Sequence, residues 1–582
     1  MRIIDLIHQL LPAGTDAAYL VEAPTREILN RPGGARATFP SYSLCPVWPP
    51  DLFAVVGTII ERSGCYTEAS PDRNRLSQHA AELAAMARTA ASWQRMLERP
   101  PQAVRQLWHQ LVSNYGMIPL AQVAEHPSVL RVLLHLFAIA DEASAGMGWD
   151  RRARDGRHSE LALNVLINAV DDPSIPNPFV LPYWPHSLCG MVSPDHVVVL
   201  PKSLTTTKGC TIRSLSHHLA LLPCRTTLNP SWFLVSRKAA QRRANEIRLL
   251  LVPYPFFIPD DSFELTSSRT QLGNGTTHAA FFRLRQRWLE DAAGPTLSGT
   301  DLAELLVLPL IEQATAASGG LAPNGIVFPE CALSEQVANE LVKALAGTEI
   351  EFLITGVLAE NARTGRSLNQ AKMYALIEGE GALPREQNKH HRWRIDQTQA
   401  DTYGLNFDTD PDNHQWWEDI HLTGRQLPFY AFRKDMSMVT LICEDLARMD
   451  PAMNAIRAVG PNLVVALLMD SPQLYFRWPG RYAGVLTDEP GCSVLSLTCL
   501  ATVDRSNRYF KSTRRVVGLW SQPSIQGKAA AQEEIEVQPD HHGVLLTLKS
   551  SPFHQTTLDN RSDAYAARQL SLIGQQSLQV QI

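Results

Sequence analysis

The sequence predicts an α/β domain over residues 245–550 and a large, mainly helical region before it. After about residue 245, short apolar runs typical of strands alternate with stretches of helical periodicity. Before residue 245, apolar residues recur every three or four positions, as on one face of a helix. The chain has 582 residues, more than one hydrophobic core usually organises, so several domains are expected.

We divide the chain into four regions. They are a mainly helical N-terminal region, a mixed connecting region, the α/β domain and a polar C-terminal tail: 1–158, 159–244, 245–550 and 551–582. In the first region, a helix begins near Leu76 and stops before Pro100, because proline breaks a helix. The further elements expected before residue 245 are helices at 102–114, 127–141 and 161–169 and a strand at 197–200.

The α/β domain alternates strands and helices along its length. The strands expected are 247–252, 325–328, 351–356, 373–378, 437–442 and 463–468, and the helices are 302–317, 334–346 and 451–459. Asp450 and Pro451 supply a cap and a first-turn proline for the last of these helices, and Gly460 ends it. The tail after residue 551 is either disordered or crosses to a neighbouring subunit.

The charge balance excludes some classes of partner. Lys and Arg number 53 and Asp and Glu 58, a net charge of −5, so no overall positive field attracts nucleic acid or an anionic membrane. No stretch approaches the run of about 18 apolar residues that spans a bilayer, and Met1–Gly14 lacks the apolar core of a secretory signal. We therefore expect a cytoplasmic protein without a membrane or nucleic-acid partner.

The nine cysteines are an odd number without the tight spacing of a disulfide framework, so free thiols are expected. Four residues of metal-ligand type lie close in sequence: Cys210, His217, His218 and Cys224. They lack the closely spaced cysteine pair of a typical zinc site, and a packed helix over 215–222 explains the two histidines equally well. We predict no metal and no other cofactor.

One cysteine occupies the place of a nucleophile. Five apolar or β-branched residues, Met438–Ile442, run directly into Cys443, and acidic residues and a helix follow. A sharp strand-to-helix turn of this kind exposes nucleophiles in α/β hydrolases. On this segment alone, a buried cysteine acting as a small apolar side chain explains the pattern better.

Two other segments favour the catalytic interpretation. Asn324–Phe328 is an expected strand followed by Pro329 and Glu330, which places a carboxylate at a strand terminus. The strand expected at 373–378 leads through a glycine turn to Lys389. A free thiol, with a pKa of about 8.5, needs a nearby base and cation to react at neutral pH, and a glutamate and a lysine are residue types that can supply them.

In this order the segments resemble the nitrilase, or carbon–nitrogen hydrolase, superfamily over about residues 245–550. The matching residues are Phe328-Pro329-Glu330, Asn369-Gln370-Ala371 leading to Lys389-His390-His391, and Cys443-Glu444-Asp445-Leu446. Lys389 lies 59 residues after Glu330, and Cys443 lies 54 residues after Lys389, a second interval longer than expected for the family. The segment from Cys443 through Arg481 also resembles nitrilase-like modules of bacterial anti-phage systems.

The resemblance implies a four-layer αββα sandwich, no metal and a Glu-Lys-Cys triad of Glu330, Lys389 and Cys443. Glu330 would take the thiol proton and return a proton to the leaving amine, while Lys389 and the backbone N–H of Glu444 stabilise the oxyanion. The expected reaction is hydrolysis of a non-peptide amide, nitrile or carbamoyl bond of a small molecule through a Cys thioester or thioimidate. The weaker resemblance adds an effector role in anti-phage defence.

Three further residues are candidates at the site. Glu418 lies 25 residues before Cys443, an interval similar to that of a second active-site glutamate in the family, although a glutamate at the rim explains it equally well. Arg477 and Trp478 fall where the family lines its substrate pocket. They would hold a carboxylate or a planar group, although Trp478 fits the core as well.

The family also implies a homo-oligomer, either a dimer or a higher assembly such as a filament. The helical region has apolar stripes at 76–97 and 130–141, which pack within the subunit or against another subunit or a trigger protein. Two alternatives to the hydrolase are a non-catalytic scaffold with this fold and a glutaminase subunit that supplies ammonia to a synthetase. The complete set of triad residues disfavours the first, and the lack of a phosphate-binding glycine loop disfavours the second.

Overall fold

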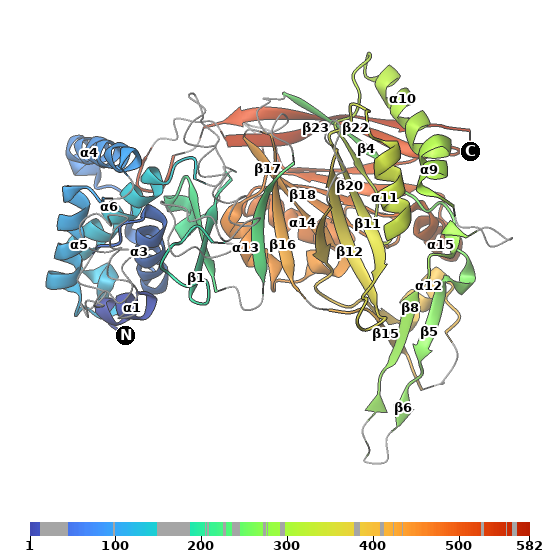
Figure 1. The fold of residues 1–582 in the computed structure, drawn as a ribbon, viewed down its shortest axis with the longest axis horizontal. Coiled ribbons are helices and arrows are strands. Elements are labelled where there is room, and N and C mark those ends of the chain that lie inside the picture. The colour runs from blue at the N-terminus through green and yellow to red at the C-terminus, as the bar shows by residue number, and fades with distance from the viewer. Residues whose placement is uncertain are drawn as a thin grey trace, which may run out of the picture. The chain divides into compact units, whose positions relative to one another are not determined.

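The computed structural model describes the chain in ranges with gaps between them: 1–11, 45–96, 99–147, 187–203, 205, 209–224, 228–235, 245–271, 275, 277–290, 297–376, 384–407, 412–422, 424–433, 435–524, 529–554, 556–561 and 567–581. These residues form two compact units (Figure 1). Unit 1 comprises Met1–Trp232, Asn454–Gly460 and Phe553–Ala567. Unit 2 comprises Phe233–Met453, Pro461–Pro552 and Arg568–Ile582.

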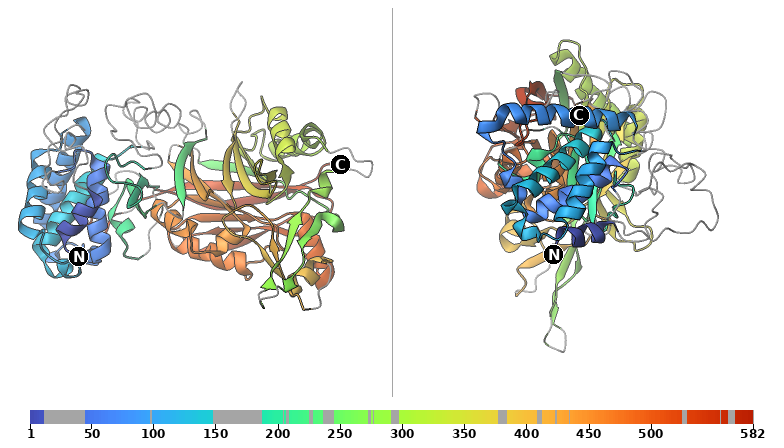
Figure 2. Two further views of the ribbon diagram at one scale, coloured as in Figure 1. Left: turned by 60° about the horizontal axis from the view of Figure 1, so that its bottom comes forward. Right: turned by 90° about the vertical axis from the view of Figure 1, so that its left-hand side faces the viewer.

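Unit 1 is mainly helical, as Figure 1 and Figure 2 show. Its helices are α1 (Ile3–Leu10), α3 (Pro49–Ser63), α4 (Leu76–Arg95), α5 (Gln102–Tyr115) and α6 (Pro127–Ala143). The predicted helices α4, α5 and α6 are confirmed, and α6 contacts both others. Helix α3 had no recognisable period in the sequence because every residue from Pro49 to Ile60 is buried.

The connecting region contributes a two-stranded antiparallel ribbon of β1 (Val197–Pro201) and β2 (Leu219–Pro223). The predicted strand β1 is confirmed. The helix considered over 215–222 is wrong, because Leu219–Pro223 pairs residue by residue with β1. Short apolar runs fit a buried strand and a buried helix equally well, so the sequence does not separate them. The helix predicted at 161–169 lies outside the described residues.

Unit 2 is a four-layer αββα sandwich, as the family resemblance implies. Its first sheet follows the order β13-β12-β11-β9-β4-β22-β23, with β10 beside β11. The strands are β4 (Glu246–Leu251), β9 (Gly325–Val327), β10 (Leu333–Ser334), β11 (Phe352–Glu360), β12 (Ser367–Ala375), β13 (Arg385–Asn388), β22 (Gly543–Phe553) and β23 (Ala567–Leu578). Apolar side chains of α9 (Gly299–Leu302), α10 (Leu308–Ala317) and α11 (Glu335–Ala344) form one core with this sheet.

The second sheet follows the order β21-β20-β19-β18-β17-β16-β3. Its strands are β3 (Asn229–Leu234), β16 (Gln426–Arg433), β17 (Met436–Ile442), β18 (Leu463–Leu467), β19 (Ser493–Leu497), β20 (Val516–Gln522) and β21 (Ala531–Glu536). Helices α14 (Trp478–Asp488) and α15 (Leu500–Phe510) contact it. The sheets meet where Thr440 of β17 donates a hydrogen bond to Gln387 of β13 at 2.9 Å. The predicted helix after the cysteine is α13 (Ala452–Val459), most of which belongs to unit 1.

A third, smaller sheet follows the order β14-β15-β8-β5. Its strands are β5 (Phe263–Ser267), β8 (Ala280–Leu284), β14 (Arg394–Asp396) and β15 (Gln415–Glu418), and helix α12 (Gln397–Tyr403) follows β14. A further pair, β6 (Thr270–Gln271) and β7 (Thr277–His278), completes the strands of the described ranges. None of the helices that the structure describes is long and apolar enough to cross a membrane.

Part of the predicted tail is an integral strand. Neither disorder nor exchange with another subunit describes Ala567–Leu578, which forms β23 beside β22 at the edge of the first sheet. Several of its residues are exposed, including a run of four in its second half. An edge strand needs few buried side chains, so its polar composition concealed it in the sequence.

Candidate active site

Glu330 lies just beyond the end of β9, where two backbones come close together. Gly356 of β11 donates its N–H to the carbonyl of Pro329 at 3.0 Å. A Cβ on Gly356 would lie 2.5 Å from the Glu330 Cα and 2.4 Å from the Pro329 oxygen, so only glycine admits this contact. The Glu330 side chain is 3% exposed. The strand end therefore buries a carboxylate.

Lys389 and Glu418 meet Glu330 in one buried cluster. Lys389 follows β13, and Glu418 is the last residue of β15. The Nζ of Lys389 donates to Glu330 Oε1 at 2.8 Å and to Glu418 Oε2 at 2.9 Å. The Glu418 carboxylate also accepts the backbone N–H of Trp393 at 2.9 Å. With its side chain 8% exposed, Glu418 belongs to the buried cluster and not to a solvent-exposed rim.

Asn369 of β12 connects the two carboxylates. Its Nδ2 donates to Glu330 Oε1 at 2.8 Å and to Glu418 Oε1 at 3.0 Å. Oε1 of Glu330 thus accepts two hydrogen bonds, whereas its Oε2 is buried and has no hydrogen-bond partner among the described residues. The carboxylate therefore keeps one oxygen available to accept a proton from another group.

Cys443 occupies the sharp turn that the sequence predicts. It follows β17 directly and starts a short 3₁₀ helix, Cys443–Ala447, with a φ of 44°. A positive φ is uncommon for a residue with a side chain, and such strained positions cluster at functional sites. The thiol is free, and the residue is 4% exposed. A nucleophile on a sharp turn between a strand and a helix typically has this backbone geometry, because the strand holds the residue in place.

Asp445 joins the Cys443 turn to the segment that carries Lys389. Its buried carboxylate accepts the backbone N–H of His390 at 3.0 Å and a hydrogen bond from Nδ1 of His391 at 2.9 Å. Asp445, two positions after Cys443, thereby holds His390 and His391, the two residues after Lys389. Asp445 therefore fixes the thiol and the ammonium relative to each other.

The three proposed catalytic groups shift one another's pKa values. Burial raises the pKa of Glu330, with the Glu418 carboxylate adding to the effect and the Lys389 ammonium opposing it. Although burial lowers the pKa of Lys389, the two carboxylates raise it well above its usual value. Burial and the Glu330 carboxylate raise the pKa of Cys443, whereas Lys389 lowers it. At neutral pH the resting Cys443 is thus a thiol.

Two other buried thiols also sense the Glu330 carboxylate. Cys331 follows Glu330 with a φ of 52°, and burial together with this carboxylate raises its pKa well above the usual value. Burial also raises the pKa of Cys499, and the same carboxylate adds to the shift. A base close by therefore does not by itself distinguish Cys443; its position at the strand-to-helix turn does.

The residues predicted to bind substrate have different surroundings. The Glu444 side chain forms an ion pair with Arg448. The backbone N–H of Glu444 is the first one after the nucleophile, Cys443. Arg477 precedes α14, and its guanidinium contacts the Asp470 carboxylate at 3.1 Å and donates to the Pro472 carbonyl at 3.0 Å. Arg477 therefore already has a carboxylate partner.

Trp478 is half-buried at the start of α14. Its ring meets the edge of the Tyr482 ring, with the centroids 6.4 Å apart. This position combines partial packing with partial exposure.

Asp470 acts on the thiol and Tyr403 contacts Asp470, and no sequence pattern points to either residue. The Tyr403 hydroxyl donates to Asp470 at 2.7 Å, and the Asp470 carboxylate contributes to the raised pKa of Cys443. They come from α12 and from the segment after β18. Asn369 stood within a quoted motif, but its place between two carboxylates follows only from the geometry.

The four residues weighed as zinc ligands do not form one group. Within the described ranges, the only cluster with at least three possible metal ligands consists of Glu142, His217 and His218. Cys210 and Cys224 are not part of it, and Cys210 is exposed. No spacing rule points to Glu142, which lies 75 residues before His217.

No protein-family model matches this sequence, and no curated protein sequence matches it. The chain is similar in structure to a glutamine-dependent NAD(+) synthetase from Cytophaga hutchinsonii, at 12% identity and a TM-score of 0.26, over 52% of this chain and 42% of that chain. This chain therefore spans less than half of the synthetase.

It is similar to Saccharomyces cerevisiae Nit3, a member of branch 10 of the nitrilase superfamily, at 12% identity and a TM-score of 0.27, over 52% of this chain and 93% of that chain. It is also similar to the amidase from Nesterenkonia sp. AN1, at 9% identity and a TM-score of 0.24, over 52% of this chain and 94% of that chain. The matches include members of the superfamily that the sequence resembles. At these TM-scores the likenesses say nothing about the site, which rests on its own geometry.

Proposed function

We propose that this chain is a member of the nitrilase superfamily and hydrolyses a non-peptide carbon–nitrogen bond of a small molecule, with Cys443 as its nucleophile. The observation that carries the proposal is the Glu330 carboxylate. One of its oxygens is saturated by Lys389 and Asn369, and the other is buried without a partner among the described residues. A base with one oxygen free and the other fixed suits proton transfer from a neighbouring thiol.

In the proposed reaction, Glu330 Oε2 takes the Sγ proton as Sγ attacks the electrophilic carbon. For an amide or carbamoyl group, a tetrahedral oxyanion forms, and Glu330 returns the proton to the leaving nitrogen as the C–N bond breaks. The thioester on Cys443 is then hydrolysed by water, which Glu330 deprotonates before the thiol leaves protonated. A nitrile would instead form a thioimidate. The raised pKa of Glu330 favours both halves of the cycle, because a stronger base holds the proton between steps.

Lys389 is proposed to stabilise the oxyanion together with the backbone N–H of Glu444. An ammonium has three N–H donors, and the carboxylates of Glu330 and Glu418 occupy two of them. Within the part of the chain that the structure describes, the third meets no acceptor and is proposed to serve the developing charge. Glu418 is proposed to act through the lysine, because its carboxylate accepts a second hydrogen bond from the ammonium at 2.9 Å.

Arg477 and Trp478 remain proposals for the substrate-binding side. Because Asp470 already neutralises the guanidinium, a neutral planar group fits this position better than a free carboxylate. The partly exposed indole of Trp478 would pack against such a group. We therefore favour an uncharged amide, nitrile or carbamoyl compound.

We also propose a cytoplasmic homo-oligomer in which the N-terminal unit regulates assembly or binds a trigger protein, as in an anti-phage effector. Large apolar side chains are exposed just before α14 and along it: Tyr475, Phe476, Tyr482 and Val485. A cluster of this kind supports contact with another copy of the chain, since monomeric surfaces carry few such patches. The defence context rests on the sequence resemblance alone.

The function is tested by ammonia release. The full chain and its Cys443→Ala variant are incubated with a panel of primary amides, nitriles and carbamoyl compounds. We expect release by the parent chain and a loss of at least about a thousandfold in the variant, since the only proposed covalent nucleophile is gone. Equal release by both proteins contradicts the proposal.

A further inference from the structure

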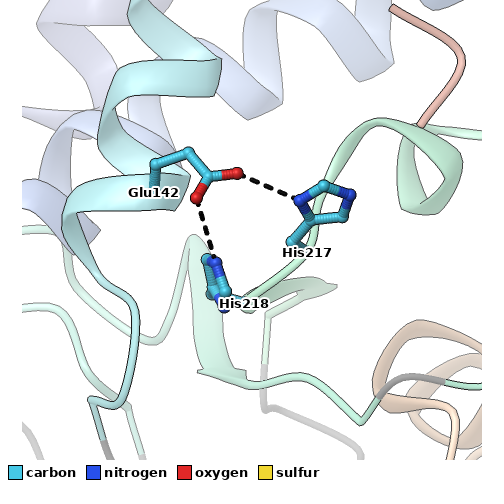
Figure 3. A group of neighbouring side chains, drawn as sticks. All are labelled: Glu142, His217 and His218. Atoms are coloured by element: carbon cyan, nitrogen blue, oxygen red, sulfur yellow. Dashed lines mark hydrogen bonds and ion pairs between the residues drawn. The ribbon is translucent and has the colours of Figure 1, made fainter. Parts of the chain in front are cut away.

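Unit 1 holds two histidines and a carboxylate in one cluster (Figure 3). Glu142, near the end of α6, points one oxygen at each imidazole. Its Oε1 lies 3.0 Å from Nδ1 of His217, and its Oε2 lies 3.3 Å from Nε2 of His218. Both histidine side chains are at least nine-tenths buried. One ligand atom of each residue lies within 4.8 Å of the others.

These separations suit a tetrahedral ion. With metal–ligand bonds of about 2.0–2.1 Å, two ligands of a tetrahedral ion lie about 3.3 Å apart. The imidazole nitrogens lie 3.0 and 3.3 Å from the Glu142 carboxylate, each from a different oxygen. A hydrogen bond between a carboxylate and an imidazole has a similar length, so distance alone does not separate the two arrangements.

The backbone beneath the imidazoles is fixed independently of any ion. Asp141, the residue before Glu142, is completely buried. Its carboxylate accepts the backbone N–H groups of His217 at 2.6 Å and His218 at 2.9 Å, and that of Leu219 at 3.0 Å. The Asp141 carboxylate therefore holds the backbone of both histidines, and both imidazoles face the Glu142 carboxylate. A metal site requires ligands that are held in place in this way.

Among the described residues, the charges around the cluster balance only when both imidazoles are protonated. The Arg561 guanidinium lies 3.2 Å from the Asp141 carboxylate, 3.0 Å from Glu142 and 3.0 Å from Asp559. Three carboxylates and one guanidinium carry a net charge of −2 when both imidazoles are neutral. A buried net charge is costly unless it is compensated, and one divalent cation compensates this one. Arg561 would then orient the Glu142 carboxylate from outside the coordination shell of the ion.

We propose that Glu142, His217 and His218 bind one divalent transition-metal ion, with Zn²⁺ as the ion that best fits two imidazoles and a carboxylate. Three protein ligands leave one position of a tetrahedral shell for water. The ion links α6 to the segment before β2, and through Arg561 to the returning segment Phe553–Ala567 of the same unit. The ion therefore stabilises unit 1. Its site shares no residue with the Glu330 cluster.

The test is calorimetric titration of the chelator-stripped full chain with ZnCl₂. We expect one equivalent bound and a higher thermal midpoint with zinc than without it. His217→Gln, His218→Gln and Glu142→Gln should each weaken binding by at least about a hundredfold, since a lost ligand costs more than a lost outer partner. His109→Ala, at an exposed histidine of α5, should bind as the parent does.

Two further measurements keep the proposal falsifiable if a cluster variant fails to fold. Cys210→Ser removes the exposed thiol and should leave the stoichiometry at one. The parent chain loaded with Co²⁺ should show tetrahedral d–d absorption without a sulfur-to-cobalt charge-transfer band. Absence of saturable zinc binding by the stripped parent overturns the proposal, and so does a thiolate band or loss of binding in Cys210→Ser. A cluster in which Glu142 only pairs with protonated histidines would give the first of these results.

Discussion

Replacing Glu330 by Gln removes the proposed base while preserving the size of the side chain. The amide oxygen can still accept the two hydrogen bonds, each 2.8 Å long, that Lys389 and Asn369 donate to Oε1. At the position of Oε2 the new NH₂ group meets no partner among the described residues. The variant therefore keeps the cluster together but loses the oxygen that takes the proton.

The structure gives the size of both effects. A positioned acid–base group contributes roughly 10²–10⁴-fold, so we expect turnover to fall by that factor, which corresponds to about 2.7–5.4 kcal/mol. A buried donor without a partner costs about 1–3 kcal/mol of stability. The second effect lowers the thermal midpoint but leaves the variant folded when the parent has ordinary stability.

Alkylation by iodoacetamide separates a lost base from a collapsed site. The Glu330 carboxylate raises the pKa of Cys443, so its removal lowers that pKa and increases the thiolate fraction. We expect Glu330→Gln to lose turnover while Cys443 is alkylated at least as fast as in the parent near neutral pH. Glu312→Gln, at an exposed glutamate of α10, serves as the matched control. Turnover within tenfold of the parent refutes the reasoning, and so does a parallel fall of both rates.

Three further predictions follow from the same cluster and from the proposed assembly. Lys389→Ala should lose roughly 10²–10³-fold or more in turnover as an oxyanion-site residue, measured by ammonia release; a loss confined to KM would contradict that role. Turnover should disappear as the pH falls through the raised pKa of Glu330, at a higher pH than for an ordinary glutamate, and Lys389 should cause no alkaline loss below about pH 10. Light scattering should show the full chain as a homo-oligomer, and a chain starting near residue 240 should form a different assembly; a monomeric full chain or an unchanged assembly would disprove the respective claim.

The strand ends that carry the site could be predicted because they have local signals. Apolar runs that lead to Glu330 and to Cys443 indicate strands that are followed by a reactive side chain. The structure has β9 before Glu330 and β17 before Cys443. The approach of Glu330, Lys389 and Glu418 to one another could only be expected from the family resemblance. The bridge made by Asn369 is a contact between side chains of different strands, and no sequence spacing encodes it.

Other parts of the fold escaped prediction for physical reasons. Helix α3 is buried over most of its length and so lacks an amphipathic period. Strand β2 is five residues long and entirely apolar before its proline, which fits a helix equally well. Glu142 joins the two histidines from a helix 75 residues earlier in the chain, and only the folded structure reveals the cluster.

The covalent intermediate on Cys443 tests the account most directly. The full chain is mixed with a substrate that it hydrolyses, quenched in acid at intervals shorter than one turnover, and analysed by intact mass and peptide mapping. We predict one acyl or imidoyl group per chain on the peptide that contains Cys443, and none in Cys443→Ala. An adduct on Cys331 or Cys499, or hydrolysis by Cys443→Ala within tenfold of the parent without any adduct, would contradict the proposed mechanism.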